Sequence, residues 1–481
     1  MPLFQKGHES VPLHAMASFK KGRGQMSAND ANFVYYCELR LSNVKAFTPG
    51  TVLDLRLDGR PAPWTLILGE NGLGKTTLLQ CLALMRPILN VEQSGKTDAR
   101  PPDRVEPALP IYDDNLLVEL ARIGDELQVE LEAEFSVGRE LRSSELPKNH
   151  SKPVTTGATF RTKQRDLSEF EFTNVKRRDV VAPLLVAYSA ARHPPYRRSE
   201  VVADHDDPAA SLFNPEIELA DAVQVLENLD HLTLRKDKQS KALYVNIKSA
   251  LAEILPEIGD PKRIHVYGPP SPSQPDKPSG VWIETYSGEV PLQSLSVGYQ
   301  TMFAWTVDLA WRMAQHHTTS EDPLREPAIV LIDELDLHLH PKWQRRIRRD
   351  LSKVFPRVQF IVTTHSPVLA QTYLDTNIAV VKRDGDHASI DNDPKTVSSW
   401  RLDQVSVSLL HDLDPYSPEI VEAFQTRRAL LGKKRLNATE KARLNEANIL
   451  VAAIPSELDP DDLKAAELIR EAAHLLATRP K

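Results

Sequence analysis

The stretch GENGLGKTT at positions 69–77 decides the fold expected for this chain. The apolar run WTLIL at 64–68 precedes it and predicts a buried strand, and LLQCLALM at 78–85 follows it as a predicted helix. In that context G-x-x-x-x-G-K-[ST] binds phosphate, because its backbone N–H groups and the helix dipole face the phosphate oxygens. We expect Lys75 to reach the terminal phosphates of a nucleotide and the Thr76 hydroxyl to hold Mg²⁺. The candidate phosphate-binding residues are Gly69, Glu70, Asn71, Gly72, Leu73, Gly74, Lys75, Thr76 and Thr77.

The composition is that of an ordinary globular protein, with 481 residues, 41% hydrophobic and 26% charged. The net charge of −7 gives no overall attraction to nucleic acid or to an anionic membrane, so any DNA contact must come from a local patch. No apolar run approaches the ~20 residues of a transmembrane helix, and the N-terminus lacks the apolar core of a signal peptide. Cys37 and Cys81 lie in predicted core segments and are expected to be buried thiols. We therefore expect a cytoplasmic protein without membrane contact.

The segments around the phosphate loop predict a mixed α/β protein. Alternating runs at 33–47 and 51–57 predict an antiparallel β subdomain ahead of a parallel core. Further predicted segments are strands within 116–135, at 184–188 and at 281–286, and helices over 216–256.

Basic residues gather in three stretches. Residues 1–32 are polar, and we expect a disordered, solvated tail there, with Met26 as an alternative start. Residues 139–180 fit one of two structures: an exposed insertion that contacts a polyanion, or a solvated loop. We favour the solvated loop. The segment SAARHPPYRR at 189–198 follows a predicted strand, and its arginines either reach phosphate or nucleic acid or form surface ion pairs.

A second strand brings the expected catalytic acids. The run AIVLI at 328–332 ends in Asp333 and Glu334, the Walker B pattern. Asp333 is placed to hold Mg²⁺, and Glu334 to activate the attacking water as general base. Another buried strand, FIVTT at 360–364, ends at His365. The carboxyl ends of parallel strands meet at one edge of a sheet, so we expect His365 beside the acids, where it senses or positions the γ-phosphate.

Between these motifs, SLSVGYQ at 294–300 opens a predicted helix that runs to about Met313. A serine, a glycine and exposed N–H groups at a helix start form a second anion site. Its candidate residues are Ser296, Gly298 and Gln300.

Two alternating histidines, His338 and His340, follow the Walker B acids. A zinc pair would need further cysteine or histidine ligands, and none with convincing spacing is present. We therefore expect a loop at a subunit contact. A basic amphipathic helix is predicted next, at 342–354.

These motifs, in this order, resemble the ABC-type ATPases of the SMC/RecF/OLD group. The stretches DELDLHLHPKWQ at 333–344 and FIVTTHSP at 360–367 carry the resemblance, and AYSAAR at 187–192 and SLSVGYQ at 294–300 add to it. The chain looks most like the compact ATPases of bacterial anti-phage systems, the PtuA subunit of Septu and its retron-linked relatives. The resemblance covers about residues 34–400 and, more loosely, the C-terminal helices.

The resemblance implies an ABC-type P-loop ATPase head of α/β class. Such a head has a mixed parallel core sheet, an antiparallel β subdomain and a helical lobe. The head would span 33–400, with 139–180 as a basic insertion and 205–265 as the helical lobe, followed by a C-terminal helical region at 401–481. The segment between the phosphate loop and SLSVGYQ lacks sustained heptads, so we expect no long SMC-like coiled coil.

The resemblance also implies a mechanism, in which two heads of a homodimer or higher homo-oligomer sandwich two ATP molecules. Each ATP, with Mg²⁺, would be bound by residues of both heads. One head would contribute its residues in cis: Lys75, Thr76, Asp333, Glu334 and His365. The other head would contribute Ser296 to Gln300 in trans. Gln164 lies in a poorly patterned region, so the Q-loop glutamine of the family is not assigned. The implied partner is a separately encoded nuclease effector of HNH type, and DNA or a phage component is a further candidate.

The C-terminal part is predicted to be helical at 418–433, at 439–453 with Thr439 as N-cap, and from 456 to about 477. The acids of RDGD at 383–386 suggest a Toprim nuclease, but no matching acidic strand end lies upstream, so we expect no built-in nuclease. We expect the helices to pack on the ATPase. The resemblance implies a second role for them, as a docking site for a partner.

Three functions from different classes fit the sequence. We favour an ATPase whose closure on ATP controls a nuclease effector in phage defence. The alternatives are a RecF-like DNA-binding ATPase in repair or recombination, and a scaffold that binds ATP without useful turnover. A transporter ATPase is disfavoured because Leu335-Asp336 follows Glu334, where that group has Pro-Thr or Pro-Ser.

Overall fold

The computed structural model describes residues 33–89, 105–107, 119–121, 126–138, 154–163, 166–173, 183–192, 207–214, 216–256, 258–268, 279–371, 376–393, 418–431 and 437–452. The chain divides into two compact units, one up to Val405 and one from Ser406. The predictions for the tail at 1–32, for Gln164, for the arginines at 197 and 198 and for a helix at 456–477 lie outside the described residues.

A six-stranded sheet with strand order β11-β15-β16-β5-β17-β18 forms the centre of the first unit. All neighbouring pairs are parallel except β17 and β18, which form an antiparallel hairpin at one edge. The strands β5, β11, β15 and β16 are buried throughout, which a parallel sheet covered on both faces requires. The bounds are β5 Trp64–Gly69, β11 Leu185–Tyr188, β15 Ala328–Ile332, β16 Val358–Thr364, β17 Asn377–Asp384 and β18 His387–Asp391.

A second, antiparallel sheet has the strand order β10-β9-β8-β1-β2. Its strands are β1 Phe33–Ser42, β2 Thr51–Asp54, β8 Glu126–Gly138, β9 Val154–Lys163 and β10 Asp166–Thr173. Two short hairpins, β3 Arg56–Leu57 with β4 Arg60–Pro61 and β6 Pro87–Leu89 with β7 Val105–Pro107, complete the strands near it.

Two predictions for this region are wrong. The insertion at 139–180 was expected to be a loop, but β9 and β10 form most of its second half. Threonine and phenylalanine favour strands there, although the overall polarity of the segment suggests a loop. A strand was also expected from 116, whereas Glu119 and Leu120 are helical and β8 begins only at Glu126.

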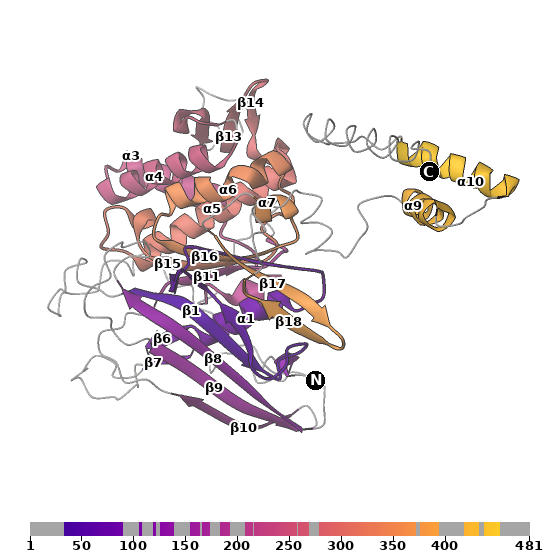
Figure 1. Cartoon of the computed structure of the whole chain (residues 1–481). Coiled ribbons are helices and arrows are strands. Elements are labelled where there is room, and N and C mark those ends of the chain that lie inside the picture. The colour runs from indigo at the N-terminus through magenta and orange to yellow at the C-terminus, as the bar shows by residue number, and fades with distance from the viewer. Residues whose placement is uncertain are drawn as a thin grey trace, which may run out of the picture. The chain divides into compact units, whose positions relative to one another are not determined.

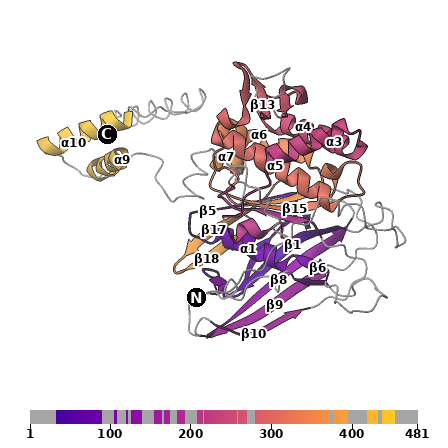
Figure 2. The same ribbon diagram turned by 180° about the vertical axis from the view of Figure 1, so that it is seen from behind.

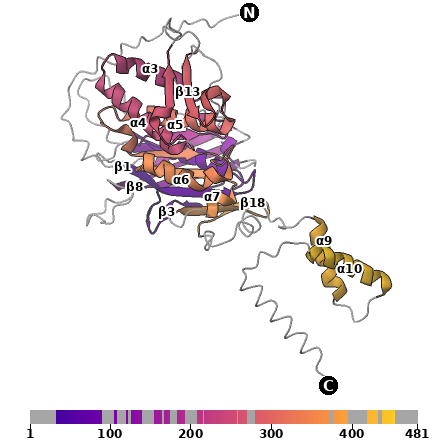
Figure 3. The ribbon, with the colours of Figure 1, turned by 90° about the horizontal axis from the view of Figure 1, so that it is seen from above.

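Figure 1 shows the layers of the first unit, with helices above the core sheet and the antiparallel sheet below it. The upper helices are α3 Ala222–Leu234, α4 Lys238–Ile254, α5 Val297–His316, α6 Pro341–Val354 and α7 Pro367–Gln371. Helix α1, Lys75–Met85, lies between the two sheets, as the view from behind also shows (Figure 2). A small sheet of β12 Ile264–Tyr267, β13 Gly280–Thr285 and β14 Gly288–Pro291 lies beside the helices, which is clearest from above (Figure 3).

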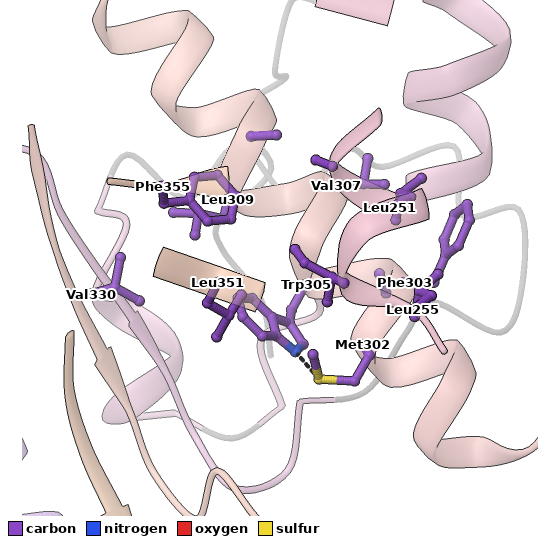
Figure 4. Packing of buried hydrophobic residues seen from close by; sticks show 14 of the residues in the cluster. Leu251, Leu255, Met302, Phe303, Trp305, Val307, Leu309, Val330, Leu351 and Phe355 are labelled. Carbon is purple, nitrogen blue, oxygen red and sulfur yellow. Dashed lines mark hydrogen bonds between the residues drawn. The ribbon is translucent and has the colours of Figure 1, made fainter. Parts of the chain in front are cut away.

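The alternation of side chains along β15 separates two hydrophobic cores. Val330 and Ile332 belong to the cluster that holds the helices, and Ile329 and Leu331 belong to the cluster around α1. In the helical cluster Trp305 of α5 is fully buried, and its indole N–H faces the Met302 sulfur (Figure 4). The two cores pack against both faces of the central strands, so the loops at the carboxyl ends of these strands follow well-packed strands.

The second unit contains two described helices, α9 Pro418–Leu431 and α10 Ala438–Ala452. The side chain of Asn437 accepts a hydrogen bond from the Glu440 N–H at 2.8 Å, and the Glu440 carboxylate accepts one from the Asn437 N–H at 3.0 Å. This is a capping box, so the N-cap is Asn437 and the prediction of Thr439 is wrong.

Candidate nucleotide site

The glycine-rich loop joins the end of β5 to the start of α1. Gly72 and Gly74 have φ of 79° and 93°, which favour glycine. At Gly74 a Cβ would also lie 2.9 Å from the ring of Phe47, so a larger residue would collide there. The loop therefore takes a course that only glycine permits at Gly74, and it carries Lys75 and Thr76 into the first turn of α1.

The Lys75 ammonium lies over the loop that precedes it. Its Nζ donates hydrogen bonds to the carbonyl oxygens of Gly69 at 2.9 Å and Glu70 at 2.7 Å. Burial lowers the Lys75 pKa to about 8, against the opposing influence of Asp333 and Glu334. The group is therefore a cation at neutral pH, held where a phosphate chain that follows the loop would meet it.

The Walker B acid Asp333 joins two strand ends and the phosphate loop. The Thr76 hydroxyl donates to Asp333 Oδ2 at 2.8 Å, and the Thr363 hydroxyl donates to Asp333 Oδ1 at 2.6 Å. Thr363 also accepts the N–H of Glu334 at 2.8 Å. Thr363 is not among the predicted site residues; the pair of threonines that ends the buried strand next to the Walker B strand is the pattern that marks it.

Glu334 occupies a turn directly after β15. Its φ is 49°, a left-handed value that is uncommon for a residue with a side chain. Burial raises the Glu334 pKa, and the nearby Asp333 and Asp336 add to the effect. Its carbonyl oxygen accepts a hydrogen bond from Arg192 Nη2 at 2.5 Å. A half-buried carboxylate with a raised pKa has the properties expected of a general base.

His365 follows the carboxyl end of β16, between the strands that carry Asp333 and the phosphate loop. A polar network surrounds it. The Thr364 hydroxyl donates to the Asp336 carboxylate at 2.5 Å, and the Ser366 hydroxyl donates to Gln344 Oε1 at 2.6 Å. The structure thus brings His365 to the same edge of the sheet as the other candidates in cis.

The second candidate anion site, at the start of α5, is separate from the phosphate loop. Ser296 is the N-cap of α5 and is exposed, as is Val297, while Gly298 packs against the loop that contains His338. The Gln300 amide donates to the carbonyl of Leu295 at 2.7 Å. Within the described part of the chain, no hydrogen bond joins Ser296, Gly298 or Gln300 to the phosphate loop.

The two histidines after Walker B have local structural contacts. His340 is the N-cap of α6, and its Nδ1 accepts the Lys342 N–H at 3.2 Å. His338 has a φ of 66° and presents its carbonyl oxygen to Gly298. Among the residues that the structure describes, no group of three or more histidine, cysteine or acidic side chains is arranged to hold a metal ion.

The geometry fits a magnesium nucleotide. Mg²⁺ prefers oxygen ligands and usually takes only one or two from the protein, the rest coming from water and substrate phosphates. The Thr76 hydroxyl and the Asp333 carboxylate lie in direct contact beside the loop, which matches that donor set.

A scan against protein families matches residues 65–370 to the model described as "AAA domain, putative AbiEii toxin, Type IV TA system". The matched segment is more than half of the chain and runs from β5 past His365. The chain belongs to this family. Its mixed α/β fold, with a parallel core sheet covered by helices, confirms the predicted fold class.

Curated relatives include proteins of two named systems, the retrons and Septu. The chain is 35% identical over 175 residues to the "Retron Ec83 probable ATPase" of Escherichia coli, which covers 36% of this chain and 30% of the relative. It is 24% identical over 423 residues to the Septu protein PtuA of Bacillus mycoides, covering 85% of this chain and 50% of the relative. The predicted resemblance to Septu and retron ATPases is thus confirmed, although the chain spans half or less of the length of these two relatives.

Solved structures similar to this chain include an SMC head bound to the C-winged helix domain of ScpA. It is 14% identical, with a TM-score of 0.40, and the match covers 74% of this chain and 97% of that one. The recombination mediator RecF is 13% identical, with a TM-score of 0.35, and the match covers 75% of this chain and 99% of that one.

No helix in the described part of the chain is both long enough and apolar enough to cross a bilayer.

Proposed function

We propose that this protein binds and hydrolyses ATP with Mg²⁺, and that ATP-dependent closure of two heads controls a separately encoded nuclease in anti-phage defence. The observation that carries the enzymatic part is the 2.8 Å contact between the Thr76 hydroxyl and Asp333 Oδ2. It joins the first turn of the phosphate-loop helix to the strand that ends in Glu334. Two motifs 257 residues apart in sequence are thus in contact, which supports the proposal of one shared site.

Each group in cis has a role in this mechanism. Lys75 neutralises charge on the terminal phosphates, and Thr76 and Asp333 hold the magnesium ion, which supplies charge stabilisation to the phosphates when bound. Glu334 takes the proton of the attacking water. His365, at the adjacent strand end, positions the γ-phosphate.

The proposal of two heads is supported by the start of α5. Ser296 and Val297 are exposed there, and Val297 is 50% exposed despite its apolar side chain. Ser296 does not cap its own helix with its side chain. The exposed N-terminus of a 20-residue helix can accept phosphate from a nucleotide bound to a second copy. In this proposal Ser296, Gly298 and Gln300 complete the site of the partner copy.

The proposed effector function is supported by the relationship to Septu and retron ATPases. The second unit, with α9 and α10, is the proposed dock for the nuclease because it forms a compact unit of its own. Its exposed apolar side chains Leu431, Ile449 and Leu450 offer contact area.

The proposal is tested by purifying tagged Glu334→Gln protein from its native host with Mg-ATP. The amide spares ATP binding but cannot take the proton, so the closed dimer should accumulate. Lys75→Ala, which loses the phosphate contact, is the control that should stay monomeric. We expect a nuclease to co-purify with the Glu334→Gln protein and both variants to lose protection against phage.

Other outcomes separate the parts of the proposal. Salt-sensitive DNA binding that strengthens with ATP, without a nuclease, would favour the RecF-like function. Full protection by Glu334→Gln together with loss of protection by Lys75→Ala would favour a scaffold without useful turnover.

A further inference from the structure

Arg192 contacts the main chain of the proposed general base from a neighbouring strand. It lies four residues after the end of β11, which pairs in parallel with the Walker B strand β15. Its side chain is buried, and the residue is 5% exposed. Its Nη2 donates to the Glu334 carbonyl oxygen at 2.5 Å.

The turn that Arg192 contacts is held from both sides. A left-handed backbone is unfavourable for a residue with a Cβ, so the turn at Glu334 needs stabilising contacts. On one side, the N–H groups of Glu334 and Leu335 donate to Thr363, at 2.8 Å to its hydroxyl and 3.0 Å to its carbonyl. On the other side, the Glu334 carbonyl oxygen accepts hydrogen bonds from the Leu337 N–H at 3.0 Å and from Arg192 Nη2 at 2.5 Å.

We propose that Arg192 is a positioning residue for Glu334, whose guanidinium holds the left-handed turn and so fixes the direction of the Glu334 side chain. This inference rests on the proposed function, because it takes Glu334 as the general base. Arg192 acts through Glu334 and needs no contact with the nucleotide.

The charges around Arg192 agree with this role. Burial lowers the Arg192 pKa to about 10, against the opposing charges of Asp333, Asp336 and Glu334, so the group is a cation at neutral pH. That cation lowers the Glu334 pKa, against the larger effect of burial. Within the described residues, Arg192 Nε has no hydrogen-bond partner. The guanidinium donates its hydrogen bond from Nη2 to the Glu334 carbonyl oxygen.

The test compares Arg192→Met and Arg192→Lys with a matched control, Arg86→Met. Arg86 is a similarly buried arginine, 8% exposed, whose partner is Asp207 at 2.7 Å. For each protein, kcat and KM for ATP are measured, with thermal unfolding to establish that the variant is folded.

We expect Arg192→Met to lower kcat about 100-fold while KM changes less than about threefold, because a misplaced base costs rate and not binding. Arg192→Lys keeps a cationic donor and should restore part of the rate. Arg86→Met should leave kcat and KM unchanged.

A second measurement keeps this inference separate from the proposed function. If the wild-type protein does not hydrolyse ATP, the proposed function fails, and amide hydrogen exchange then decides the positioning role. Faster exchange of the Glu334 and Leu335 amides in Arg192→Met, with unchanged exchange in α1, supports it. Unchanged exchange at those amides, or an equal fall in activity in the Arg86→Met control, overturns it.

Discussion

Gly298, at the start of α5, lies so close to the carbonyl oxygen of His338 that a Cβ at Gly298 would be 2.2 Å from it. Gly298 belongs to the site proposed to act in trans, and His338 follows the Walker B acids that are proposed to act in cis. The contact therefore connects the two halves of the mechanism within one chain. Any movement of the loop around His338 must be transmitted to the α5 N-terminus, because backbone meets backbone without a side chain between them.

The first prediction concerns Gly298→Ala. The added methyl group must push the α5 N-terminus away from His338, and overpacking of this kind costs about 2 kcal/mol of unfolding free energy. We expect ATP binding to a single head to persist and ATP-driven dimerisation, measured by light scattering, to be lost.

Gly268→Ala is the matched control for this prediction. A Cβ at Gly268 meets nothing within 4 Å, so this variant should behave as wild type. Unaltered dimerisation of Gly298→Ala would contradict the proposed part of α5 in closure.

The second prediction is a pH dependence of ATP affinity that comes from Lys75. Its pKa in the free protein is lowered to about 8, and the phosphates bind the cation better than the neutral amine. The affinity should therefore fall as pH rises from 8, by up to tenfold per pH unit. Ionisation of the phosphates themselves would act in the opposite direction.

This pH dependence is measured with a fluorescent ATP analogue, and thermal unfolding over the same pH range serves to check that the fold is intact. An affinity that stays constant between pH 7 and 9.5 in a folded protein would show that the Lys75 charge does not contribute.

The third prediction concerns magnesium. Thr76→Val removes the hydroxyl that contacts Asp333 while keeping the size of the side chain. The Mg²⁺ concentration for half-maximal ATP hydrolysis should rise at least about tenfold, the usual cost of a lost contact around a metal. Thr76→Ser keeps the hydroxyl and should stay close to wild type; a Thr76→Val enzyme with unchanged Mg²⁺ requirement would remove Thr76 from the magnesium site.

The fourth prediction concerns stability, at the pair of Asp308 and Arg312 within α5. Asp308 is fully buried and accepts hydrogen bonds from Arg312 Nε at 2.8 Å and from the Tyr188 hydroxyl at 2.8 Å. Arg312→Met leaves the carboxylate buried without its cation, so we expect a loss of about 3 kcal/mol in urea unfolding.

A surface pair provides the control for Arg312→Met. Lys353 and Glu253 form an ion pair at 2.7 Å with exposed side chains. Lys353→Met should cost less than about 1 kcal/mol. Equal losses in the two variants would mean that Asp308 is not stabilised by Arg312.

Local patterns of residues predict several elements of this fold. The Gly-rich loop has a backbone course that glycine alone allows at Gly74, so the loop and its flanking strand and helix are readable from the residues. The buried strands at β5, β15 and β16 appear as apolar runs because both faces of a parallel sheet are covered. The fold class follows from these runs, and it is confirmed, whereas the assigned site residues stay predictions.

Which strand ends meet depends on how the strands are ordered in the folded sheet, and no local pattern contains that order. The order β11-β15-β16-β5 places Arg192, Glu334, Thr363 and Lys75 along one edge, although their order in the chain is different. Thr363 contacts the Asp333 carboxylate, and Arg192 contacts the Glu334 carbonyl oxygen. Both partners lie in another motif, so the residues next to Thr363 and Arg192 in sequence do not predict these contacts. Polar strands such as β9 and β10 were missed for the same physical reason. Their pairing energy comes from neighbouring strands that are distant in sequence, and a local window contains none of it.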